Sequence, residues 1–159
     1  MKLTATLIAT LLGMTLPLAH AKDPRAHHAH EPVHDVRVVL ALTSGERAMI
    51  LEEMRMFLDG VQKLTGALGK QDMQATADAA RNMGQKMVHE VPPALRAKLP
   101  LEFRQLGFSV HRDFDQIALD AESLKDVSTS LNQLSTTLQK CVSCHTMYQI
   151  RSPRLDAAH

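Results

Sequence analysis

The residues with the clearest chemical potential form one short run, Cys141-Val142-Ser143-Cys144-His145. On a helix, positions i, i+3 and i+4 share one face, so both thiols and the imidazole point the same way. Two thiols one turn apart can add to the two vinyl groups of one haem, and the adjacent histidine can then reach the iron. The run therefore predicts one covalently bound haem c per chain, attached through Cys141 and Cys144, with His145 as an iron ligand.

Two cysteines at this spacing have three other possible uses. A thioredoxin-like dithiol follows a strand at the start of a helix, whereas this pair stands near the end of a chain with helical patterning. A structural zinc site needs further ligands at regular spacing, which the sequence lacks. A disulfide between Cys141 and Cys144 stays open as an alternative in an oxidising compartment.

Four amphipathic helices are expected to position the run. The first follows the capping-box pair Thr43 and Glu46, and its apolar residues recur at spacings of three and four until Gly69. Asp72 can cap the second helix, which the prolines at positions 92 and 93 stop. The inward face of this second helix consists largely of small residues, which let a neighbouring element come close.

The third helix is predicted from near Pro100 to Leu124, and the fourth contains the cysteines. The predicted inward stripe of the fourth helix is Val127, Leu131, Leu134, Leu138, Cys141, His145 and Tyr148. Four such helices with short connections predict an all-α fold, an antiparallel up-down-up-down four-helix bundle with covalently bound haem. Residues 36–42 are apolar enough for a strand or for the front of a helix, and the pattern leaves both open.

The composition fits one ordinary domain. The chain has 159 residues, 45% of them apolar and 22% charged, with a formal net charge of +1. These values exclude disorder throughout and the strongly basic balance of a nucleic-acid-binding protein. The sequence shows no acid–base dyad, nucleophile triad or phosphate loop, so we expect a protein that is not an enzyme.

The N-terminus has the features of a secretory signal peptide over residues 1–21. Lys2 precedes an apolar stretch from Leu3 to Leu18, and Ala19-His20-Ala21 offers a small-x-small cleavage site. The stretch is shorter than the roughly 20 residues that a membrane span needs, so we expect export without stable membrane insertion. Cleavage would leave a mature chain of zero formal net charge.

Residues 22–43 have the composition of a leader or linker before the helical domain at 44–151, and residues 152–159 would form a C-terminal tail. The leader holds four histidines: His27, His28, His30 and His34. Imidazoles can bind copper or zinc, so a metal-handling role is one alternative function. Their spacing defines no coordination geometry, which favours a flexible leader.

The export signal, the four helices, the single Cys-x-x-Cys-His in the last helix and Tyr148 three residues after His145 together resemble the class II c-type cytochromes. These are the cytochromes c prime and the related low-spin cytochromes c-556. The resemblance covers residues 44–151. It implies a periplasmic protein with one haem inside the bundle, and homodimers through the first two helices are common in that family.

In the family that the chain resembles, function depends on which residue of the first helix covers the iron. In proteins like cytochrome c prime an apolar residue leaves the iron five-coordinate and open to gases, whereas a methionine binds it in those like c-556. Met54 lies near the centre of the inward stripe, while Met49 and Met56 point roughly 120 degrees or more away from it. Arg47 and Leu51 repeat a spacing seen in some cytochromes c prime, which would put Leu51 over the iron. We favour Met54, because Leu51 lies at the edge of the stripe.

Two further positions bear on the iron. His111 lies on the flank of the third helix, where a half-buried histidine bonded to a carboxylate is a commoner arrangement than an iron ligand. Many members of the family have a basic residue directly after the tyrosine that corresponds to Tyr148. This chain has Gln149 there and Arg151 two positions later, which departs from the pattern on which proximal gas chemistry depends.

A histidine and methionine pair on a buried haem keeps the iron low-spin in both oxidation states. The sequence therefore predicts a periplasmic mono-haem c-type cytochrome that carries electrons between redox partner proteins through transient contacts. An open iron position would instead suit a protein that binds nitric oxide or carbon monoxide.

Overall fold

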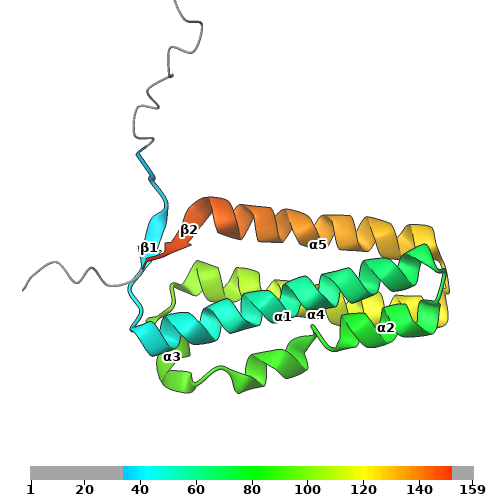
Figure 1. Ribbon diagram of the computed structural model, residues 1–159, viewed down its shortest axis with the longest axis horizontal. Coiled ribbons are helices and arrows are strands. Elements are labelled where there is room, and N and C mark those ends of the chain that lie inside the picture. Colours follow the sequence, from blue (N-terminus) through cyan, green and yellow to red (C-terminus); the bar gives the residue numbers. More distant parts are fainter. Residues whose placement is uncertain (1–33, 152–159) are drawn as a thin grey trace, which may run out of the picture. The chain divides into compact units, whose positions relative to one another are not determined.

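The computed structural model describes residues 34–151 (Figure 1). The expected signal peptide, most of the His-rich leader and the C-terminal tail lie outside the described residues. The compact unit that contains the helices begins at Asp35. This unit is mostly helical, in agreement with the predicted all-α class, and it also contains two short strands.

The elements follow one another in a simple order. They are β1 (Val38–Leu40), α1 (Ser44–Gly69), α2 (Met73–Arg81), the 3-10 helix η1 (Gln85–Glu90), α3 (Pro93–Lys98), α4 (Leu101–Ser123), α5 (Val127–Met147) and β2 (Tyr148–Ile150). Helix α2 packs against both α1 and α4, and α4 packs against α5, whereas α1 and α5 make few contacts with each other. No helix within residues 34–151 is long and apolar enough to cross a membrane.

The start of α1 confirms the predicted capping box. The Thr43 hydroxyl accepts a hydrogen bond from the Glu46 amide at 3.3 Å, and the Thr43 amide donates to the Glu46 carboxylate at 2.9 Å. Asp72 caps α2 as expected, since its carboxylate accepts from the Ala75 amide at 2.9 Å. These local signals begin both helices because each cap satisfies an amide that has no partner within the helix.

The prediction of one second helix up to the prolines is wrong, because α2 ends at Arg81 and a separate 3-10 helix follows. The Asp115 carboxylate of α4 accepts hydrogen bonds from both the amide and the side chain of Gln85, at 3.1 and 2.9 Å. It approaches Gly84 so closely that a side chain at that position would collide with it. The Gln85 amide thus bonds to α4 in place of a carbonyl of α2.

Two groups of apolar residues form the core. The larger lies between α1, α2, α4 and α5 and includes Leu64, Met83, Phe114, Ile117 and Leu134. The smaller lies beside the strands and consists of Leu40, Leu42, Ile50, Leu95 and Leu99. Apolar burial of this kind is what stabilises short helices that would be marginal alone.

Helix α5 buries only part of its predicted inward stripe, namely Leu134. Its buried residues are Ser130, Leu134 and Thr137, whereas Leu131 and Leu138 are 47% and 37% exposed. The buried face is therefore rotated by about one position from the prediction. The reason is that α5 packs mainly on α4, so the side that carries the stripe has no closely packed helix against it.

The two strands were not predicted as a pair. They run parallel, with Val38 beside Tyr148 and Leu40 beside Ile150, so the open alternative for residues 36–42 resolves as a strand over 38–40. Figure 1 shows the pair at the end of the molecule where α5 finishes and α1 begins. Tyr148, expected on the fourth helix, is instead the first residue of β2, because pairing with β1 draws the chain into an extended conformation.

Candidate functional site

A cavity of about 260 Å³ lies between α1, the two strands and the C-terminal end of α5. Five of the six predicted site residues line it: Leu51, Met54, Cys144, His145 and Tyr148. The chain thus brings residues of its first long helix to the motif of its last one. The sixth predicted residue, Cys141, lies one turn before Cys144 on α5 and does not line this cavity.

Both cysteines are free thiols and half-buried. Burial raises the pKa of the Cys141 thiol, and burial together with the neighbouring Cys141 raises the pKa of Cys144. The Cys141 thiol points back to the Thr137 carbonyl oxygen at 3.7 Å. At neutral pH these groups are therefore protonated thiols.

These properties bear on the other uses of the cysteines. A reactive dithiol needs a lowered pKa, because the thiolate is the nucleophile, and both shifts here run the other way. No disulfide joins Cys141 and Cys144 in this structure. Within residues 34–151, no group of three or more His, Cys, Asp and Glu side chains could hold a metal ion, so a zinc site of that composition gains no support there.

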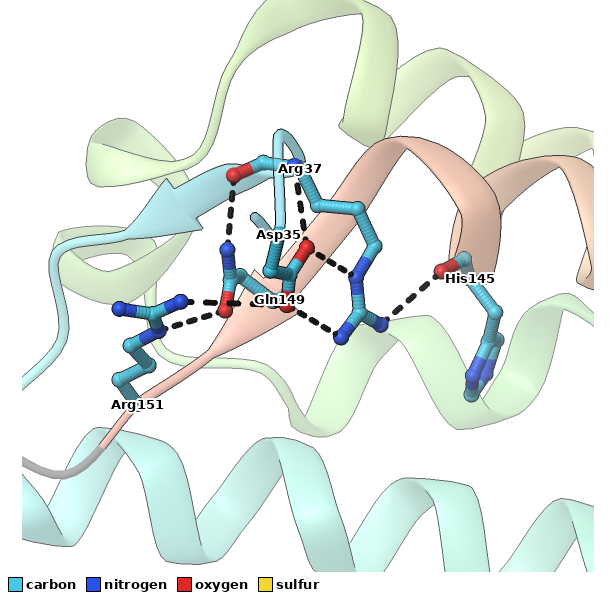
Figure 2. Close-up of polar contacts among 5 residues, drawn as sticks. All are labelled: Asp35, Arg37, His145, Gln149 and Arg151. Carbon is cyan, nitrogen blue, oxygen red and sulfur yellow. Dashed lines mark hydrogen bonds and ion pairs between the residues drawn. The ribbon is translucent and has the colours of Figure 1, made fainter. Parts of the chain in front are cut away.

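His145 is exposed, which contradicts its predicted burial on the inward stripe of α5. Its backbone carbonyl accepts a hydrogen bond from Arg37 Nη1 at 3.2 Å (Figure 2). Within the described part of the chain, its imidazole makes no hydrogen bond. Both ring nitrogens are therefore free of protein partners there, and the ring borders the cavity.

The two candidates for the position opposite His145 both reach the cavity. Leu51 and Met54 are half-buried and lie about one turn apart on α1. Met49 and Met56 are more exposed and line a different cavity beside Met87, which confirms that they point away from the site. Of these four residues of α1, Leu51 and Met54 line the cavity that His145 borders, and Met49 and Met56 do not.

His111 is not part of this site. It is 3% exposed, its Nδ1 lies 2.8 Å from the Met83 carbonyl oxygen, and its Nε2 lies 3.2 Å from Glu53 Oε1. The predicted bond to a carboxylate is confirmed, although the histidine is fully and not half buried. These two contacts join α4 to the segment after α2 and to α1.

A second cavity of about 450 Å³ adjoins the first, since Ile50 and Phe103 line both. Arg96 and Arg104 also line this second cavity. The buried Nε of Arg96 has no hydrogen-bond partner among the described residues, which is an unusual state for a buried donor. The two guanidinium groups are the ones that could hold the carboxylates of a flat apolar cofactor, but Glu53 and His111 line this cavity too, so its wall is not purely apolar and basic.

Two residues of the site, Arg37 and Phe103, were not anticipated from the sequence, and Gln149 was noted only as a departure from the family pattern. Arg37 falls in the segment that resembled a linker, and no local signal there pointed to the site. Phe103 falls within the predicted third helix, and its ring meets Tyr148 edge-on at 5.3 Å between centroids. Gln149 is buried, donates to the Arg37 carbonyl oxygen at 2.8 Å and accepts from Arg151 at 2.6 Å.

No family model matches the chain, and neither a curated protein nor a solved structure matches it. The residues around the cavity are therefore the basis on which a function can be argued.

Proposed function

We propose that the chain is an exported mono-haem c-type cytochrome that carries electrons, built as a four-helix bundle of the class II type. One observation supports this most strongly: Cys144 and His145, at the end of the Cys-x-x-Cys-His run, line the same cavity as Met54 of α1. A histidine and a thioether facing one space are the ligand pair of a low-spin haem.

The two thiols have the chemistry that covalent attachment requires. Each S–H group would add across one vinyl double bond, so that sulfur forms a thioether bond to one carbon and hydrogen passes to the other. No electrons are gained or lost overall in such an addition. The raised pKa of Cys141 and Cys144 keeps both protons on sulfur at neutral pH.

His145 and Met54, which line one cavity, would hold the iron through an imidazole nitrogen and a thioether sulfur. When bound, the haem supplies one-electron redox chemistry. Met54 would favour the ferrous state, and the apolar wall formed with Ile50 and Phe103 would exclude water from the iron. Electron exchange would use brief contacts with redox partner proteins, for which small interfaces suffice.

Gas binding is the second candidate, because Leu51 lines the same cavity as Met54. If Leu51 covered the iron, an open position would remain for nitric oxide or carbon monoxide. Metal handling by the leader stays a prediction, since three of its four histidines lie outside the described residues. Export to the periplasm and pairing of two copies likewise stay predictions.

Expression with haem-maturation machinery tests the proposal. We expect purified protein whose mass includes one covalently bound haem, with a sharp reduced absorption spectrum that carbon monoxide changes little. The double variant Cys141→Ala/Cys144→Ala is the matched control and should carry no covalent haem. Wild-type protein without bound haem would refute the proposal, and a broad spectrum that shifts on adding gas would favour the second candidate.

A further inference from the structure

Four residues beside His145 form a closed ring of polar contacts, in which one link runs through the Arg37 backbone carbonyl (Figure 2). Asp35 accepts from Arg37 Nε at 3.0 Å and from Nη2 at 2.8 Å. Gln149 donates to the Arg37 carbonyl oxygen at 2.8 Å and accepts from Arg151 Nε at 2.6 Å. Arg151 closes the ring through Asp35 at 3.8 Å.

One side-chain contact leaves the ring, and it goes to the candidate iron ligand. Arg37 Nη1 donates to the carbonyl oxygen of His145 at 3.2 Å. Helix α5 ends at Met147, so the carbonyl of His145 is among the last four and has no partner within the helix. A guanidinium there satisfies that carbonyl and also complements the negative end of the helix dipole.

We infer that Arg37 is a positioning residue for His145, held in place by Asp35 and Gln149. This inference rests on the proposed function, because it concerns the histidine that would bind iron. A ligating histidine is usually oriented by a hydrogen bond to its second ring nitrogen. Within residues 34–151 the imidazole has no such bond, so its direction depends on how firmly its backbone is held.

The charge of Asp35 keeps its contact with Arg37 in place through the neutral pH range. The hydrogen bond from the Arg37 side chain lowers the pKa of Asp35 to about 2, so Asp35 is a carboxylate throughout the neutral range. Its two oxygens engage Nε and Nη2 of Arg37, which leaves Nη1 directed at His145. The buried Gln149 holds the Arg37 backbone as well.

Arg37 also lines the cavity that His145 borders. A positive charge so near the iron position would disfavour the ferric state, which carries the higher charge. Arg37 would therefore act in two ways, by holding the backbone of His145 and by raising the reduction potential.

The test compares haem-loaded variants. Arg37→Gln removes the charge and the hydrogen bond, and we expect at least about a threefold fall in the ferrous-to-ferric ratio at a given solution potential. Gln149→Leu changes no charge, and we expect a broadened ferric spectrum from more than one orientation of His145. Arg55→Gln, which removes an exposed arginine paired with Glu52 on α1, should match the wild type.

Arg37→Lys is the second variant, to be used if Arg37→Gln does not acquire covalent haem. It keeps the positive charge but loses the two-pronged contact with Asp35, so the ferric spectrum should broaden while the potential falls less. Wild-type potential and spectrum in Gln149→Leu and in the Arg37 variant that matures would overturn the inference alone. Absence of covalent haem from the wild type would overturn the proposed function, and the inference with it.

Discussion

Arg37 and His145 stand 108 positions apart in the sequence, yet Arg37 Nη1 donates a hydrogen bond to the His145 carbonyl oxygen at 3.2 Å. The contact exists because β1 pairs in parallel with β2, directly after the end of α5. A segment with the composition of a linker thereby becomes one wall of the site. The function of the chain would then depend on residues before its first helix as well as on the cysteine motif.

The strand β1 should contribute measurably to stability through Leu40. This side chain is 3% exposed and packs in the smaller core group, whereas Val38 on the same strand is 54% exposed. We expect Leu40→Ala to lower the free energy of unfolding by about 2–4 kcal/mol, because it leaves a cavity. Val38→Ala should change it by less than about 0.5 kcal/mol. Urea denaturation of the haem-loaded protein measures both, and equal effects would show that β1 does not pack as described.

Spectroscopy can show whether Met54 binds the iron or whether Leu51 covers it and leaves it open. Met54→Ala should convert the haem-loaded protein from a low-spin to a high-spin spectrum and should allow carbon monoxide to bind, because it removes the thioether ligand. Met56→Ala, two positions away on α1, should keep the wild-type spectrum since Met56 lines another cavity. If Met54→Ala leaves the spectrum unchanged, Met54 is only a wall residue.

His111 should matter for stability and not for iron. Its buried ring joins the Met83 carbonyl oxygen on one side and Glu53 on the other. We expect His111→Ala to lower the free energy of unfolding by about 2–4 kcal/mol, through the cavity and the unpaired groups left behind. The absorption spectrum of the haem-loaded variant should stay that of the wild type. A stable protein with a changed spectrum would mean that His111 binds iron instead.

We expect the folded protein to lose stability in acid, because Asp35 becomes protonated. Its hydrogen bond from Arg37 lowers its pKa from 3.8 to about 2, so folding favours the charged form. The contribution is present above about pH 4, where Asp is ionised in the unfolded chain, and is lost as the pH falls toward 2. Urea midpoints across this range should therefore fall less steeply for Asp35→Asn than for the wild type. Parallel profiles would show that the ring does not form in solution.

Features that depend on near neighbours along the chain could be predicted from the sequence. The capping box of Thr43 and Glu46 begins α1, Asp72 begins α2, and Pro100 precedes α4, because each signal acts within about one helical turn. The order of the Cys141, Cys144 and His145 side chains along α5 follows from helical spacing in the same way. These local rules were enough to predict a mostly helical chain and a candidate haem-binding motif.

Which distant segments meet depends on how the helices pack, and local patterns could not predict it. The break after α2 depends on Asp115, some thirty residues later, and the strand at 38–40 depends on a partner at 148–150. The face that α5 buries is set by α4 and by the lack of close contact with α1, which spacing along one helix cannot reveal. Hydrogen bonds between segments far apart form only after the helices have packed, so no local pattern in the sequence announces them.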